Sequence, residues 1–183
     1  MPNHVTNVIS FPNDEKKVDE IRSFMTDEAS GLEFDFNKLI PMPEYIFRGN
    51  LGAEERYKYG KDNWYDWSIE NWGTKWNAYT IRWFSSCVWF ETAWTSVPKI
   101  VKALSEKFPD VEMNYSWADE ACGYNVGSIR GIRNGDFDNA DTFIPDEGSK
   151  EAFELFLNIW GAVPEEFGLR YNENTGTYEY YYE

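Results

Sequence analysis

Alternation of hydrophobic and polar residues predicts strands in five stretches of the chain. Aromatic or β-branched side chains recur there at every second position, which places them on one face of a strand. The predicted strands are His4–Phe11, Ala78–Trp83, Val88–Trp94, Val111–Trp117 and Cys122–Arg133. Near the C-terminus, the turn Asn174-Thr175-Gly176 separates two further stretches, which predicts a hairpin with strands Gly168–Tyr171 and Thr177–Tyr182.

Hydrophobic residues spaced three or four positions apart predict helices elsewhere. The predicted helices are Asn13–Met25, Asp62–Glu70, Ser96–Phe108 and Ser149–Trp160. Asn13 and Ser96 are residue types that commonly cap the first turn of a helix. Gly73 can take the left-handed conformation that ends one.

The order of these elements predicts an α+β fold. Strand, helix, insert, strand, strand, helix and strand follow one another, and right-handed crossovers would place both helices on one face of an antiparallel sheet. We expect one domain over residues 1–133 with an insert at about 27–73. Within the insert, Leu32–Leu39 is predicted to be extended and Phe36–Pro43 to cover the core. Residues 134–183 are predicted to form an acidic linker, a helix and a hairpin packed on the domain.

The segment from Asn71 to Asn77, with sequence NWGTKWN, carries a resemblance to a known family. Together with Thr92-Ala93-Trp94 and the opening residues 1–5, it resembles the YubB-like family of small phage and plasmid proteins. The resemblance covers about residues 1–133 and implies a ferredoxin-like βαββαβ domain, in agreement with the order of elements. It implies no particular activity, and it departs at Thr95–Pro98, where a Ser-Pro-Pro type of turn is expected.

The chain is acidic, and its charge is unevenly distributed. The formal net charge is -15; residues 61–110 carry 6 basic and 6 acidic side chains, whereas residues 111–183 carry 4 basic and 15 acidic ones. Such a field repels nucleic-acid backbones and anionic membranes, so direct nucleic-acid binding is not expected, and it attracts basic partners. The same charge would also keep the chain soluble without any partner, so both interpretations stay open.

Hydropathy and cysteine content indicate the compartment. No apolar run approaches the ~18 residues that span a bilayer, and the first residues lack the pattern of a secretory signal. Two cysteines, Cys87 and Cys122, are too few for a disulfide framework. We therefore expect a cytoplasmic protein, and the resemblance implies a bacterial host cell.

Two groups of residues are candidates for binding. Lys75 lies between Trp72 and Trp76 and could form a cation–π anchor or contact a ligand, with Thr74 and Asn77 beside it. The alternative is that this turn leads into a central strand while the tryptophans fill the core. The second group consists of the linker carboxylates Asp136, Asp138 and Asp141, which could meet a basic partner.

The sequence gives little support for a metal site or a catalytic nucleophile. A calcium loop counted from Asp136 has Asp141 at its sixth position, where the pattern requires glycine. His4 is the single histidine, and Cys87 has no basic neighbour in the sequence that would lower its pKa. We therefore expect no metal, no cofactor and no catalytic residue.

The sequence thus predicts a non-enzymatic accessory protein of a phage or plasmid, which binds or inhibits a basic host protein. The alternative is a small-ligand-binding protein or enzyme with a pocket near the NWGTKW motif. The oligomeric state is left open.

Overall fold

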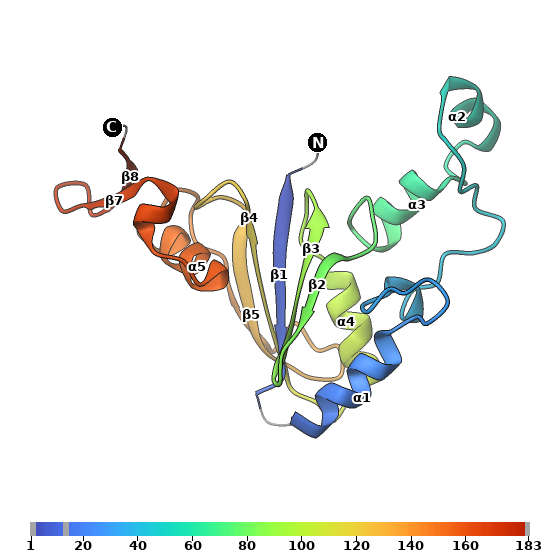
Figure 1. Cartoon of the computed structure of the whole chain (residues 1–183), viewed down its shortest axis with the longest axis horizontal. Coiled ribbons are helices and arrows are strands. Elements are labelled where there is room, and N and C mark those ends of the chain that lie inside the picture. The colour runs from blue at the N-terminus through green and yellow to red at the C-terminus, as the bar shows by residue number, and fades with distance from the viewer. Residues whose placement is uncertain (1–2, 13–14, 182–183) are drawn as a thin grey trace.

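The computed structural model describes residues 3–12 and 15–181, which form a central sheet, helices on both of its faces and a small hairpin (Figure 1). The strands are β1 His4–Ser10, β2 Tyr79–Trp83, β3 Cys87–Ala93, β4 Met113–Asp119, β5 Val126–Ile132, β6 Asp141–Phe143, β7 Leu169–Asn172 and β8 Thr177–Tyr180. The helices are α1 Glu15–Met25, α2 Ala53–Tyr59, α3 Trp64–Asn71, α4 Pro98–Lys107 and α5 Lys150–Trp160, with 3₁₀ turns η1 Phe36–Lys38 and η2 Pro164–Phe167.

Strand β1 lies in the middle of the main sheet. Within the described residues this sheet has six strands in the order β2-β3-β1-β4-β5-β6, and every neighbouring pair is antiparallel. Val8 of β1 lies opposite Trp89 of β3 on one side and Ser116 of β4 on the other. The predicted α+β class and antiparallel sheet are therefore confirmed.

The helices divide between the two faces of the sheet. Helices α1 and α4 cover one face and α5 lies against the other (Figure 1). The larger core joins Ile9 of β1 to Ile21 of α1 and Leu104 of α4. The smaller core joins Ala118 of β4 to Phe156 of α5. Helix α5 and the hairpin of β7 and β8 thus pack on the face that α1 and α4 leave open.

The insert between α1 and β2 differs from its prediction. Leu32–Leu39 was expected to be extended, and this is wrong: Asn37 N donates to Asp35 Oδ1 (2.9 Å), so that Asp35 caps η1. Helix α2 was not predicted, because none of its residues is buried and no apolar stripe marks it. Residues Leu39, Ile40 and Met42 do pack against the core, as expected for Phe36–Pro43.

Two other local expectations are corrected. Val97 and not Ser96 is the N-cap of α4, and no side chain caps this helix. The predicted linker over residues 134–146 contains strand β6, which extends the sheet beyond β5. Asn13, which was expected to cap α1, lies outside the described residues.

A buried network of hydrogen bonds joins β1 to the elements beside it. Tyr115 of β4 donates its hydroxyl to Asn7 Oδ1 (2.6 Å) and accepts from Val97 N at the start of α4 (2.8 Å). Asn7 Nδ2 donates to Thr92 Oγ1 of β3 (2.8 Å). Burial raises the pKa of Tyr115, so its hydroxyl keeps the proton that it donates. One amide side chain therefore connects three strands.

Substitution Tyr115→Phe tests this network. It leaves Asn7 Oδ1 and Val97 N buried without these partners, and we expect a loss of about 1–3 kcal/mol in the free energy of unfolding. Urea unfolding of the two proteins measures the loss. Tyr57→Phe is the matched control, since Tyr57 is 94% exposed and should change stability by less than ~0.5 kcal/mol. Equal stability of Tyr115→Phe and the wild type would contradict a structural role for the network.

Candidate functional site

The NWGTKW motif lies at the junction between α3 and β2. Asn63 caps α3 by accepting from Tyr65 N and Asp66 N (3.1 Å each). The helix ends at Asn71, Trp72 is its C-cap, and Gly73 follows at φ +84°. Glycine takes this left-handed conformation at little cost, so the chain turns sharply toward β2.

Trp72 and Thr74 have structural roles within this turn. Trp72 is 5% exposed, packs edge-on against Phe36 and donates Nε1–H to Ile40 O (2.9 Å). Thr74 is buried and donates its hydroxyl to Ala93 O (2.8 Å) at the end of β3. Neither polar group is free to bind a ligand.

The side chain of Asn77 links the insert to the start of β2 by hydrogen bonds. Its Oδ1 accepts from Phe36 N (3.0 Å), and its Nδ2 donates to Asp35 Oδ1 (2.6 Å). These contacts join residues 41 and 42 positions apart in the sequence and hold η1 against the start of β2. Asn77 was a candidate binding residue; its contacts are those of a structural residue.

Lys75 is the motif residue whose charge stays available. Its Nζ lies 4.3 Å from the ring centroid of Trp76, 5.1 Å from that of Trp94 and 6.0 Å from that of Tyr65. Trp76 and Trp94 are 39% and 40% exposed, so the expectation that Trp76 fills the core is wrong. The alternation of the predicted strand could not show this, because β2 begins only at Tyr79.

A cavity of about 580 Å³ opens beside Lys75. Its walls are Lys75, Arg48, Arg56, Trp64, Tyr65 and the loop 49–51, and we call it the basic cavity. The Arg56 guanidinium carbon lies 5.2 Å from the Tyr65 ring centroid, over the ring that Lys75 also approaches. Sequence reasoning missed Arg48 and Arg56, because the fold of residues 43–64 that brings them to Lys75 carries no periodic pattern.

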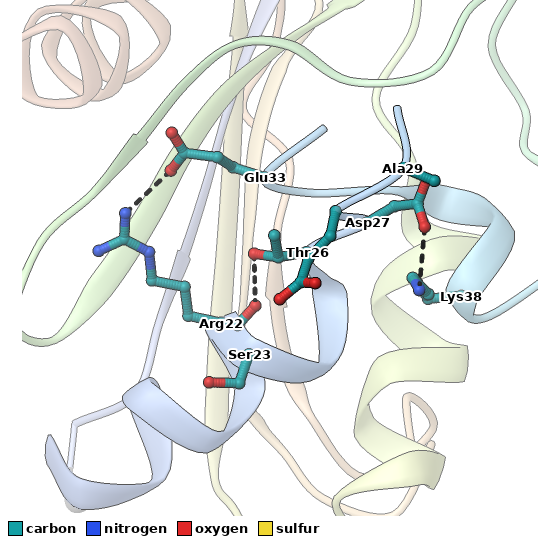
Figure 2. Close-up of a pocket in the computed structure, with 8 residues that line it drawn as sticks. Arg22, Ser23, Thr26, Asp27, Ala29, Glu33 and Lys38 are labelled. Carbon is teal, nitrogen blue, oxygen red and sulfur yellow. Dashed lines mark hydrogen bonds and ion pairs between the residues drawn. The ribbon is translucent and has the colours of Figure 1, made fainter. Parts of the chain in front are cut away.

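A second cavity, of about 720 Å³, lies between α1 and the insert. Figure 2 shows Arg22 facing Glu33 and Lys38 facing Asp27. Arg22 Nη2 lies 3.0 Å from Glu33 Oε2, and Lys38 Nζ lies 3.3 Å from Asp27 Oδ1. Because each of these cations is paired with a carboxylate, and Glu28 adds a further negative charge, this cavity has no surplus positive charge with which to bind an anion.

The carboxylates Asp136, Asp138 and Asp141 lie together near the edge of the sheet. All three are exposed; Asp136 and Asp138 precede β6, and Asp141 is its first residue, opposite Arg130 of β5. Asn139 donates from its backbone and side chain to Asp136 (3.1 and 2.7 Å), and these bonds hold the pKa of Asp136 below its ordinary value. Asp136 is thus ionised at neutral pH.

The two cysteines and Tyr79 have pKa values above their ordinary values. Burial raises the pKa of Cys122 to about 12 and also raises that of Cys87. His4 Nδ1 lies 2.8 Å from the Tyr79 hydroxyl, and burial together with Glu91 and Glu120 raises the pKa of Tyr79 to about 12. These thiols and this phenol are protonated at neutral pH. In the described part of the chain, no three of the His, Cys, Asp and Glu side chains come together as a metal site.

The sequence of residues 71–162 matches the family described as a ferredoxin-like domain in Api92-like protein. This match covers half of the chain and runs from the end of α3 through α5. The chain belongs to this ferredoxin-like family. Strand β1 precedes the matched residues, although it forms the centre of the sheet. The search of curated proteins and the search of solved structures each gave no match.

Residues 3–12 and 15–181 contain no helix with the length and apolar character needed to cross a membrane.

Replacing Trp72 or Trp76 singly by alanine tests which of the two tryptophans belongs to the core. We expect Trp72→Ala to lower the free energy of unfolding by ~3–5 kcal/mol, because it removes a buried ring. Trp76→Ala should cost less than about 1 kcal/mol, since it removes an exposed ring and one cation–π contact. Chemical unfolding curves measure both, and equal losses would contradict the observed difference in burial.

Proposed function

We propose that this chain is a non-enzymatic binding protein that docks a basic partner protein through its acidic last third. The observation that carries the proposal is the outer edge of the sheet at β6, which has no further strand beside it among the described residues and where exposed carboxylates surround exposed apolar side chains. The resemblance to the YubB-like family further supports the proposal that the chain is an accessory protein of a phage or plasmid. Its partner would then be a protein of the bacterial cytoplasm, which the chain binds or inhibits.

Charge on the last third is available to a partner. From residue 134 to residue 181 the chain has eleven acidic side chains, and all of them are exposed. The two basic side chains in this range are Lys150 and Arg170, and Lys150 pairs with Glu154 (3.6 Å). Complementary charge of this kind accelerates the encounter with a basic protein and repels nucleic acid.

Strand β6 supplies a place for such a partner to bind. It is the outermost strand beyond β5, and all three of its residues are exposed. Phe143 is 45% exposed and Ile144 is 66% exposed, and both border a hollow of about 280 Å³. An extended segment could add to this edge by backbone hydrogen bonds while its side chains cover Phe143 and Ile144. The acidic flanks favour a basic segment and repel a second acidic copy of this edge.

The variant Asp136→Asn, Asp138→Asn, Asp141→Asn tests this function. We expect association with the partner to slow by about tenfold, with a smaller change in dissociation, because charges at the rim of an interface chiefly set the encounter rate. Affinity capture from bacterial lysate at two salt concentrations, with wild type and variant as bait, identifies the partner. Kinetics with the purified partner then measure the effect.

A control variant with the same change in charge keeps this test specific. Asp19→Asn, Glu28→Gln, Glu54→Gln removes three exposed carboxylates from α1, the following loop and α2. It should leave association unchanged, and all three proteins should have the same unfolding curve. If the linker variant binds the partner as fast as the wild type, or if both variants lose binding equally, docking at β6 is refuted.

A further inference from the structure

The basic cavity gathers three basic side chains in a chain whose formal net charge is -15. The chain has 17 basic and 32 acidic side chains, yet three basic residues, Arg48, Arg56 and Lys75, line this one cavity. No acidic residue is among its lining residues. The cavity is positively charged, whereas the protein as a whole is negatively charged. A positive site in such a protein points to an anionic ligand.

These cations are weakly neutralised by the protein itself. Arg56 Nη1 is 4.0 Å from Asp66 Oδ2, a distance at which the pair is no more than loosely held. Arg48 Nη2 donates to the backbone oxygens of Met42 and Pro43 (2.9 and 3.2 Å), which orient the guanidinium without neutralising it. Within the described residues, no carboxylate lies within ion-pair distance of Lys75 or Arg48.

Contacts around the basic cavity hold its walls in place. Trp64 donates Nε1–H to Gly49 O (3.0 Å), which ties the loop 49–51 to the first turn of α3. Phe47 stacks on Tyr59 with ring centroids 4.2 Å apart, and its backbone bonds to Asp62 and Trp64. A cavity whose walls are already fixed loses little conformational entropy when a ligand binds.

Shape and chemistry together indicate the class of ligand. Guanidinium groups bind phosphate oxygens in pairs of hydrogen bonds, and an ammonium adds a point charge. The volume of about 580 Å³ lies within the ~300–1,000 Å³ of small-molecule sites and leaves space beyond a phosphate. The Trp64 side chain forms part of that remaining wall. We infer that the basic cavity binds a phosphorylated small molecule of nucleotide size, independently of the docking proposed at β6.

Calorimetric titration of the whole chain at low salt tests this inference with three probes: ADP, inorganic pyrophosphate and adenosine. We expect ADP and pyrophosphate to bind and adenosine not to bind. Lys75→Gln and Arg56→Gln should each weaken ADP binding about tenfold or more, because each removes a charge-assisted hydrogen bond. Lys75→Arg should retain binding, and raising the salt concentration should weaken it, since these charges are solvent-accessible.

A variant with substitutions in the second cavity is the control. Arg22→Gln, Lys38→Gln removes two cations that pair with Glu33 and Asp27, and it should leave the ADP affinity unchanged. Unfolding curves of all variants establish that they fold. The inference is overturned if neither ADP nor pyrophosphate binds the wild type. It is equally overturned if adenosine binds as tightly as ADP, or if the Lys75 and Arg56 variants bind like the control.

Discussion

The structure depends on how Asn7 pairs inside the core. A buried amide without partners costs about twice what one paired amide contributes, so the sheet is more stable where Asn7 meets Tyr115 and Thr92. Strand registers that differ by one residue would turn Asn7 to the opposite face. The polar network therefore selects one alignment of β1 with both β3 and β4, and the burial of Val5 and Ile9 in the core favours the same alignment. Because Val97 N belongs to the same network, the position of α4 follows from this alignment.

The NWGTKW motif, which is the most conspicuous in the sequence, mainly makes structural contacts between the insert and the sheet. Trp72 and Asn77 contact the insert, and Thr74 contacts the end of β3. This leaves Lys75 to face outward among aromatic rings. In Figure 1, α2 and α3 project away from the sheet on the side opposite α5. The molecule thus carries its positive cavity on this projection and much of its negative charge around β6 and α5.

Elements with a strong hydrophobic period could be predicted from the sequence, and those without one could not. Strands β1, β3 and β4 have hydrophobic residues at alternate positions, and helices α1, α4 and α5 have a hydrophobic face, so a period of two or of 3.6 residues marks them. Helix α2 buries no residue, and β6 has three exposed residues, so neither leaves a pattern. At the candidate site, Lys75 stood out between two tryptophans. Arg48 and Arg56 reach it only through the irregular chain between Pro43 and Asn63, which local patterns do not describe.

The central place of β1 has a consequence for the order of events during synthesis. Asn7 and Tyr115 are separated by 108 residues, which a ribosome adds in roughly 5–20 s. Until β3 has been synthesised, β1 has neither of its neighbours, and until β4 follows, one edge of β1 stays exposed to other chains. Contacts this distant in sequence also slow folding after release. A truncated chain that ends before β4 would therefore lack one neighbour of its central strand and would be prone to aggregate.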